Sequence, residues 1–325
     1  MKRDVLGDVR SVRTEMATWD LTNESWQVPM RVTVEEYRLD GKRASSETRG
    51  EGWFGRSTNI YDDAGRLIES QIQDGTGKIG RQIYSYDAAG RQIRQVHQGP
   101  DGLETFTEEN TYAADGSRTR MMYLPKMEGT VSCYTAIDDI DYYLGAEGLR
   151  TMITLFDSQG QATELLAKDE DGAILRRMVM TRDERGRLVK DELFLGSLAL
   201  GPDIPMFGAG ASFMTSEYSY DARGLRSEVI RRMSGLSEER QTYSYDQHGN
   251  KTESSTELQE REATVNEGNV EYGAPKVTRL RGRMSYRYDE RGNWVERVSS
   301  QRYGENPDYT PGSIERREIV YFDAG

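Results

Sequence analysis

The sequence predicts an all-β fold, a long antiparallel meander of hairpins that forms a twisted, curled or partly rolled sheet. A short phrase recurs along the chain, in which an aromatic residue is followed by Asp, two free positions and Gly, as in YDAAG from Tyr86 to Gly90. The clearest copies lie about 25 residues apart, enough for two strands and a second turn. The chain is polar, with a mean hydropathy of -0.79, yet it holds 19 tyrosines and 33 glycines. A folded repeat protein with a thin core reconciles these values.

The Asp and the Gly of each copy have a mechanical explanation. Asp suits the first position of a type I turn because its carboxylate accepts backbone N–H groups, and Gly suits the fourth, left-handed position. Such a turn closes a β-hairpin, and the flanking RQIYSY and RQIRQVHQ alternate between two faces as strands do. Arg or Asn often follows the Gly, and we expect its side chain to lie across the preceding tyrosine ring. The copies assigned to this structural turn motif are Tyr61, Asp62 and Gly65; Tyr86, Asp87 and Gly90; Tyr220, Asp221 and Gly224; Tyr245, Asp246 and Gly249; and Tyr288, Asp289 and Gly292.

Each unit is one hairpin step, because second turns rich in Gly, Pro, Asn or Ser lie between the copies. This count gives roughly eighteen to twenty strands. We expect a single domain over residues 1–325, in which residues 1–36 supply the first strands and a cap. Three insertions interrupt the spacing, at about residues 121–150, 193–214 and 257–284, and the charged start of the third could form a short helix.

Three segments carry a family resemblance: YDDAGRLIES from Tyr61, YSYDAAGRQI from Tyr84 and YRYDERGNW from Tyr286. They resemble the Rhs or YD repeat, usually Tyr-x-Tyr-Asp-x-x-Gly-Arg/Asn, and the resemblance runs from about Tyr37 to the C-terminus. In large members such repeats wind a sheet into a hollow shell around a toxic cargo. This chain lacks the RHS-associated core segment and a cargo domain, so the resemblance implies a small stand-alone member. It favours the bacterial envelope or the cell exterior, while a cytoplasmic location stays open because no signal peptide is visible.

Composition argues against several classes of partner. The net charge of -12, from 43 Lys and Arg against 55 Asp and Glu, disfavours a nucleic-acid partner. The single cysteine, Cys133, cannot form an internal disulfide, and with two histidines no zinc-type ligand set can be assembled. No stretch reaches the roughly 20 apolar residues of a membrane span. We therefore expect no cofactor, no metal, no nucleic acid and no transmembrane segment, and the oligomeric state stays open.

Function is expected where the repeat is interrupted, because the repeats themselves are committed to stacking. The first insertion holds acids at 138, 139 and 141, which suit a divalent cation or simply an exposed acidic turn. The second is the most apolar stretch and could fold back as a plug or cap, dock a partner or touch a membrane. Trp53 and Trp294 could stack on sugars or pack on the sheet. The candidate binding residues are Trp53, Tyr142, Tyr143, Phe194, Met206, Phe207, Phe213 and Trp294.

The sequence favours a non-catalytic repeat scaffold or binding protein that engages a protein or glycan through its sheet surface or its apolar insertion. One alternative is a carbohydrate-active enzyme with a carboxylate pair in a sheet groove. Another is a fragment of a toxin-encapsulating shell. No Gly-x-Ser-x-Gly elbow, P-loop or His-rich metal motif is present, so no catalytic residue is assigned.

Overall fold

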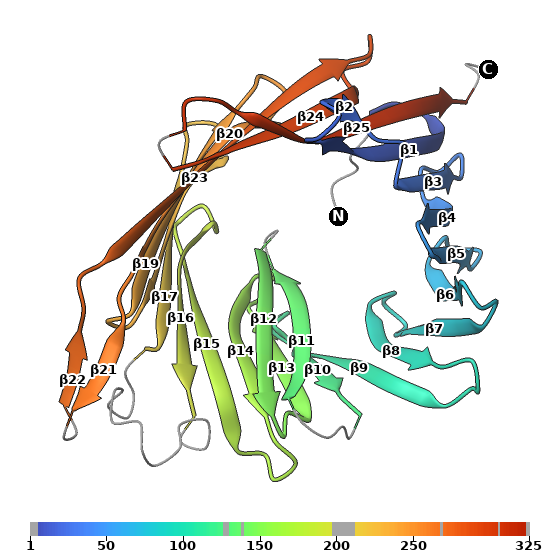
Figure 1. The fold of residues 1–325 in the computed structure, drawn as a ribbon. Helices are drawn as coiled ribbons and strands as arrows, with labels where there is room; N and C mark the ends of the chain where they lie inside the picture. The colour runs from blue at the N-terminus through green and yellow to red at the C-terminus, as the bar shows by residue number, and fades with distance from the viewer. Residues whose placement is uncertain are drawn as a thin grey trace.

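The main antiparallel sheet of the chain closes into a ring (Figure 1). The computed structural model describes residues 6–125, 130–137, 140–196, 212–266, 269–304 and 306–322. The sheet has 21 strands, and 20 of them form the ring because β2 pairs with β1 alone. Closure occurs where the first strand pairs with the last, for example Val12 with Ile319 and Met16 with Glu315.

The ring strands follow the order of the chain. The first arc consists of β1 (Val9–Asp20), β3 (Arg31–Tyr37), β4 (Arg43–Gly50), β5 (Trp53–Tyr61), β6 (Leu67–Asp74), β7 (Ile79–Tyr86) and β8 (Gln92–Gln98). The second consists of β9 (Glu104–Tyr112), β10 (Arg118–Tyr123), β13 (Thr151–Phe156), β14 (Ala162–Lys168), β15 (Ile174–Arg182), β16 (Leu188–Leu195) and β17 (Met214–Tyr220). The third consists of β18 (Arg226–Met233), β19 (Ser237–Tyr245), β20 (Lys251–Glu260), β23 (Lys276–Tyr288), β24 (Trp294–Tyr303) and β25 (Thr310–Tyr321).

Five further strands lie outside the ring order. They are β2 (Ser25–Trp26), the hairpin of β11 (Thr130–Ile137) and β12 (Ile140–Glu147), and the hairpin of β21 (Ala263–Asn266) and β22 (Asn269–Tyr272). The two hairpins fall within the first and third predicted insertions. Of the second insertion, residues 197–211 lie outside the described part of the chain.

The all-β antiparallel meander is confirmed, but the open or partly rolled sheet is wrong because the sheet is a closed barrel. Closure pairs the two outermost strands, which an open meander of this length would leave as long unpaired edges. Residues 1–36, expected as first strands and a cap, include β1, the strand that closes the ring.

The helix expected at the start of the third insertion is also wrong. Instead, β20 continues to Glu260, which pairs with Ser237 of β19 and with Lys276 of β23. Hydrogen bonds to a strand on each side outweigh the helical preference of a short charged segment. Among the described residues, no helix is long and apolar enough to cross a membrane.

The predicted aspartate and glycine of each copy form a tight hairpin turn. At the first of them the Gly65 N–H donates to the Asp62 carbonyl at 2.8 Å, and the Arg66 N–H donates to the Asp62 carboxylate at 2.7 Å. Gly65 has a φ of 75°, a conformation in which a side chain is strained. Turns of this kind connect β5 to β6, β7 to β8 and the equivalent later pairs, so they share one rim of the barrel, called here the Asp-turn rim. The other copies are Asp87 with Gly90, Asp157 with Gly160, Asp183 with Gly186, Asp221 with Gly224, Asp246 with Gly249, and Asp289 with Gly292.

The last two copies of the motif form the same turn. Gly249 has a φ of 82° and donates to the Asp246 carbonyl at 3.2 Å, while Gly292 has a φ of 80° and donates to the Asp289 carbonyl at 3.1 Å. A Cβ added to Gly249 would lie 3.8 Å from a methyl carbon of Leu225, which is ordinary van der Waals contact. At Gly292 the nearest atom would be 3.7 Å away, on the ring of His248. Both glycines are therefore required by the left-handed backbone and not by a lack of space.

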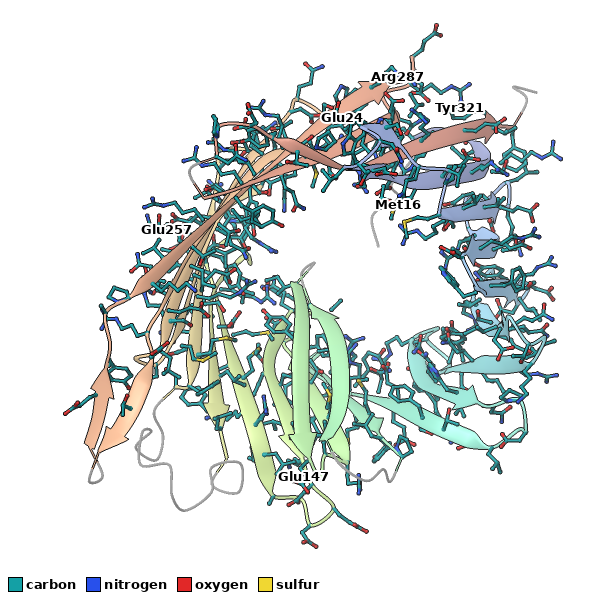
Figure 2. All side chains as sticks on the ribbon, in the orientation of Figure 1. Met16, Glu24, Glu147, Glu257, Arg287 and Tyr321 are labelled. Atoms are coloured by element: carbon teal, nitrogen blue, oxygen red, sulfur yellow. The ribbon has the colours of Figure 1, made fainter. Side chains whose placement is uncertain are left out.

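The two faces of the sheet can be told apart from labelled side chains. Figure 2 shows Met16 pointing into the ring and Glu257 lying on its outer side. Directly paired residues of antiparallel strands share a face, as do residues two apart on one strand. Starting from Met16, the residues paired in succession from strand to strand all face the interior of the ring, and they form the inner wall. This wall includes Met16, Ser57, Asp191, Ser216, Tyr218, Tyr243, Ser254 and Thr256.

The main hydrophobic core lies on one side of the ring. The β11–β12 hairpin lies on the inner side, next to β13 and β14 (Figure 1), and its Ile137, Ile140 and Tyr142 belong to a buried cluster with residues of the wall. Met152 and Leu165 of that cluster are fully buried. The first insertion therefore supplies an inner layer for the wall, and the core exists where this layer covers it.

Candidate functional site

The outer wall carries ion pairs across neighbouring strands. In one of them, an Arg177 nitrogen lies 2.5 Å from a carboxylate oxygen of Glu164. Other pairs between neighbouring strands are Arg81–Glu69, Arg232–Glu217, Arg240–Glu228, Arg279–Glu257 and Arg316–Glu296. Arg13–Glu15 and Arg49–Glu47 are further outer-wall pairs, each formed within one strand. Each exposed pair adds little stability, but together they give the outside of the barrel a charged surface.

The inner wall is rich in hydroxyl and amide side chains instead. Thr33 and Thr48 are paired there, and their hydroxyls lie 3.2 Å apart. Further examples are Thr14, Ser46, Ser57, Asn59, Ser70, Gln82, Ser254, Thr256, Ser299, Gln301 and Ser313. Charged residues of this wall form close pairs, such as Arg297 with Glu315 at 2.6 Å and Arg231 with Glu239 at 3.0 Å.

At the Asp-turn rim, the turns of Asp62, Asp87 and Asp183 are each clamped to the next hairpin by an arginine. The Nε of Arg66 donates to the Asp62 carboxylate at 2.7 Å, and its guanidinium carbon lies 5.0 Å from the centre of the Tyr86 ring. The Tyr86 hydroxyl donates to the Leu67 carbonyl at 2.7 Å. The arginine thus covers the tyrosine of the following unit, and the expectation that it covers the preceding one is wrong. The reason is that β7 is hydrogen-bonded to β6, which brings the next tyrosine beside the turn.

Where Asn replaces Arg, the clamp is made by hydrogen bonds. The Asn250 side chain donates to the Tyr288 hydroxyl at 2.8 Å, and that hydroxyl donates to the carboxylate of Asp246. Burial and this bond raise the pKa of Tyr288 to about 12. The repeated tyrosines therefore hold one hairpin to the next.

A buried polar cluster holds the inserted hairpin against the wall. One carboxylate oxygen of Asp191 accepts hydrogen bonds from the hydroxyls of Tyr142, at 3.1 Å, and Tyr218, at 2.5 Å. Asp191 is 1% exposed, and each tyrosine is 5% exposed. Burial raises the pKa of Asp191, and burial together with this carboxylate raises the pKa of both tyrosines. Both hydroxyls therefore share Oδ2 as their acceptor, while the buried Oδ1 has no hydrogen-bond partner among the described residues.

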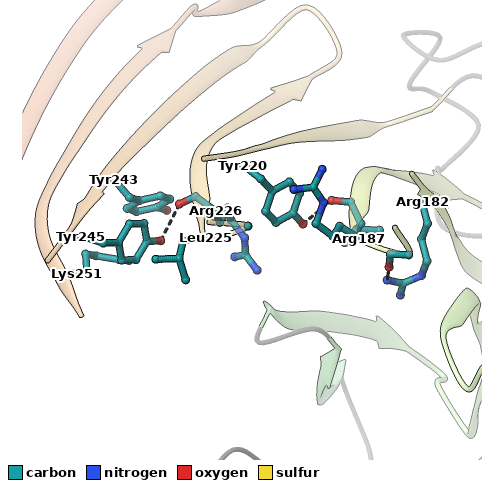
Figure 3. Close-up of a pocket in the computed structure, with 11 residues that line it drawn as sticks. Arg182, Arg187, Tyr220, Leu225, Arg226, Tyr243, Tyr245 and Lys251 are labelled. Carbon is teal, nitrogen blue, oxygen red and sulfur yellow. Dashed lines mark hydrogen bonds between the residues drawn. The ribbon is translucent and has the colours of Figure 1, made fainter. Parts of the chain in front are cut away.

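A pocket of about 550 Å³ opens on the inner wall beside the Asp-turn rim (Figure 3). The Lys251 ammonium lies 3.9 Å from the centre of the Tyr243 ring. The Arg187 guanidinium lies 4.6 Å from the centre of the Tyr220 ring. The lining consists of Arg182, Gly186, Arg187, Leu188, Tyr220, Gly224, Leu225, Arg226, Tyr243, Tyr245 and Lys251.

The turn-motif residues divide between this pocket and the rest of the rim. Tyr220, Gly224 and Tyr245 belong to the lining, so two of the five copies contribute to a site as well as to a turn. Gly249 and Gly292 are not among the lining residues, and their place is the turn alone. The same holds for the copies at Asp62 and Asp87, which lie on the opposite arc of the ring.

The candidate binding residues taken from the sequence are not brought into this pocket. Trp53 begins β5 at the opposite rim and is 51% exposed, while Trp294 begins β24 at the Asp-turn rim and is 5% exposed. Trp294 packs under Arg317, whose guanidinium carbon is 3.5 Å from the ring centre. Tyr142 belongs to the buried cluster described above.

The remaining candidates fall in or near the insertions. Phe213 packs against the core cluster, and Phe194 is half-buried on β16. Met206, Phe207 and the side chain of Tyr143 lie outside the described residues, as do residues 138 and 139 and the side chain of Asp141. Within the described ranges there is no group of His, Cys, Asp or Glu that could hold a metal.

Sequence reasoning missed the cations of the pocket, although a signal was present. Lys251 and Arg226 both stand two places after a turn glycine, where other copies have Leu67, Gln92 or Leu188. The hairpin turn does not depend on the side chain at this position, so a cation there is free to contact a ligand.

Comparison with known proteins does not support the family resemblance. No protein-family model matches the chain, and no curated protein matches it. The assignment to Rhs or YD-repeat proteins is therefore wrong, since the chain matches no such model and its sheet closes into a 20-strand barrel. The recurring motif specifies a hairpin turn and the contact of the following Arg or Asn with the tyrosine of the next hairpin.

Similarity to solved structures is weak. A porin-like protein from Bacteroides uniformis is 10% identical, with a TM-score of 0.37, and the match covers 96% of each chain. The crystal structure of CghA is 9% identical, with a TM-score of 0.14, over 100% of this chain and 97% of that one. A second crystal structure, of CghA with Sch210972, is 9% identical at a TM-score of 0.12, over 96% of this chain and 89% of that one.

Proposed function

We propose that the protein is a non-catalytic binding scaffold that takes up a glycan along the inner wall of its barrel. The observation that carries this proposal is the chemistry of that wall, where hydroxyl and amide side chains share a face with tyrosine rings, as Ser254 does with its paired Tyr243. Sugars present hydroxyl groups at their edges and apolar C–H groups on their ring faces. A wall of this composition satisfies both, with hydrogen bonds to the edges and aromatic contacts to the faces.

The charged outer wall favours contact with water over contact with lipid. A barrel wall that faces lipid carries an apolar band flanked by aromatic girdles. Here the outward residues form Arg–Glu pairs on strand after strand, including Arg13–Glu15 and Arg279–Glu257. Burying such pairs in lipid would demand desolvation of both charges. We therefore propose that water surrounds the barrel.

The proposal of a non-catalytic role is supported by the inner-wall acids near the pocket, whose carboxylates are bound to other protein groups. Among the described residues, the pocket itself is lined by no carboxylate. Asp191 is buried under two tyrosine hydroxyls, and Glu239 is paired with Arg231. A glycosidase needs two carboxyl groups facing each other across a bound sugar, and these acids already have other partners.

A glycan array probed with the full chain, followed by titration calorimetry with a bound glycan, tests the proposal. Ser254→Ala combined with Thr256→Val removes two inner-wall hydroxyls next to the pocket and keeps the shape of the wall. We expect at least about fivefold weaker binding, because each lost hydrogen bond is worth about 1 kcal/mol.

The matched control removes two hydroxyls from the exposed outer face. Thr58 and Ser85 are exposed, and their pairing places them opposite the inner wall, so Thr58→Val combined with Ser85→Ala should leave affinity within about twofold. Absence of any bound glycan, or equal losses in the two double variants, would refute the proposal.

A further inference from the structure

The inner-wall pocket concentrates positive charge in an acidic protein. Its described lining contains Arg182, Arg187, Arg226 and Lys251 and no acidic side chain, while the whole chain has a net charge of -12. Asp183 offsets one of these charges, through a 2.8 Å bond from the Arg187 Nε. The charge of the pocket is therefore local, and it cannot reflect a generally basic surface.

Two of the pocket arginines are held in fixed positions by hydrogen bonds to the wall. Arg182 donates to the carbonyls of Ala162, at 3.0 Å, and Gly186, at 3.1 Å. Arg187 is fixed by Asp183 on one side and lies over Tyr220 on the other. Side chains positioned in this way lose little conformational entropy when a ligand binds.

Lys251 is the cation whose surroundings most favour an added anion. It is half-buried, and the ring of Tyr243 at 3.9 Å supplies only the weak attraction of a π face. Burial, followed by repulsion from the nearby Arg226, holds the pKa of Lys251 below its ordinary value of 10.5. An anion placed between these two cations would relieve the repulsion and replace lost hydration.

The same pocket offers flat apolar faces beside the charges. Tyr243 and Tyr245 line it together, and the Tyr245 hydroxyl donates to the Arg226 carbonyl at 2.7 Å, which fixes its ring. Figure 3 shows these rings next to Leu225 and Lys251. A ring of the ligand can therefore stack while an attached anionic group reaches the cations.

We propose that this pocket binds the anionic group of an acidic glycan, so that a sugar ring stacks on the tyrosines and its carboxylate or sulfate contacts Lys251 and Arg226. The proposal rests on glycan binding by the inner wall and adds the charge of the ligand. Carboxylates and sulfates suit this pocket because guanidinium and ammonium groups donate several charge-assisted hydrogen bonds to their oxygens.

The test compares a ligand with and without its charge. Calorimetric titration of the full chain with an oligomer of galacturonic acid and with its methyl ester varies only the anionic group. We expect the acid to bind at least about tenfold more tightly than the ester, and the difference to shrink as salt is added.

Lys251→Gln then assigns the preference to the pocket. Gln stands at the equivalent position of another copy, Gln92, so the fold accommodates it. The variant should lose most of its affinity for the acid and keep its affinity for the ester. Lys190→Gln is the control, because Lys190 lies on the same barrel and pairs with Glu192 at 2.9 Å; it should alter neither affinity by more than about twofold.

The outcomes separate the two proposals. If acid and ester bind equally well to the unmodified protein, the anion inference fails while glycan binding stands. If Lys251→Gln and Lys190→Gln weaken acid binding alike, the site is elsewhere and the inference fails. If a neutral glycan and both probes fail to bind at millimolar concentration, glycan binding itself fails, and the inference falls with it.

Discussion

The hydroxyl of Tyr142 donates a 3.1 Å hydrogen bond to Asp191, which joins the inserted hairpin to the barrel wall at a place closed to solvent. These residues come from different strands, β12 and β16, and the wall tyrosine Tyr218 donates to the same oxygen. The position of the hairpin inside the ring depends on this cluster as well as on apolar contact.

Removing the carboxylate should therefore loosen the hairpin. Asp191→Ala leaves two buried hydroxyls without an acceptor, and we expect a loss of about 3 kcal/mol in the free energy of unfolding. Tyr142→Phe removes one donor and leaves Asp191 its bond to Tyr218, so about 1 kcal/mol is expected. Urea denaturation followed by tryptophan fluorescence measures both. Equal losses in the two variants would contradict a shared acceptor.

The pH dependence of stability should carry a signature of Asp191. Burial raises the pKa of this carboxyl on folding, so its contribution to stability is full below its ordinary value of 3.8 and is lost as the pH rises through the folded-state pKa. Turn aspartates such as Asp87 behave oppositely. The Arg91 N–H lowers the pKa of Asp87, so its contribution is lost as the pH falls below 3.8.

Asp191→Asn isolates the first effect, since both proteins keep the turn aspartates. Stability is measured by urea denaturation between pH 4 and pH 8. The stability of the unmodified protein relative to the variant should decline as the pH rises from 4. Parallel curves for the two proteins would show that Asp191 does not change its pKa on folding.

The turn glycines should be intolerant of a side chain for backbone reasons alone. Gly90 has a φ of 79°, and the atom nearest to an added Cβ is 3.9 Å away. Gly90→Ala should therefore reduce stability by about 1 kcal/mol through backbone strain. Gly55, in the middle of β5, has open space around it and no positive φ, so Gly55→Ala should be neutral or slightly stabilising. A thermal melt of each variant by circular dichroism gives the comparison.

The two forms of the rim clamp predict a graded response at Arg66. Arg66→Ala removes the ion pair with Asp62 and the contact with the Tyr86 ring, and we expect a loss of about 1 kcal/mol. Arg66→Asn introduces the residue that clamps Tyr288 at Asn250, and it should lose about half as much. Urea denaturation distinguishes them, and an Asn variant as unstable as the Ala variant would show that the two clamps are not interchangeable.

The turns could be predicted from the sequence because their cause is local. Asp62 and Gly65 are three residues apart, and both hydrogen bonding and the left-handed conformation act within that distance. Closure could not be predicted in the same way. The pairing of Met16 with Glu315 depends on the number and stagger of all the strands between them, and no short stretch encodes it.

The buried cluster and the pocket escaped prediction for a related reason. Asp191 lies in the polar stretch VKDEL, which has the pattern of a solvated strand, and its burial comes from a hairpin some 50 residues earlier. Lys251 and Arg226 alternate with acids along their strands and look like surface residues. Only the register of the closed sheet turns them toward a common pocket.

Closure between β1 and β25 also has a consequence for the order of synthesis. The partner of β1 is β25, the last strand of the ring to be synthesised, so this seam joins the two ring strands that are farthest apart in sequence. Until then β1 has β3 on one side and an unpaired row of N–H and C=O groups on the other. Pairing β1 with β25 is slow for two reasons: closing so long a loop costs much conformational entropy, and β25 is synthesised late. During translation the sheet therefore keeps an open edge that can pair with strands of other molecules, and this edge is covered only when β25 pairs with β1.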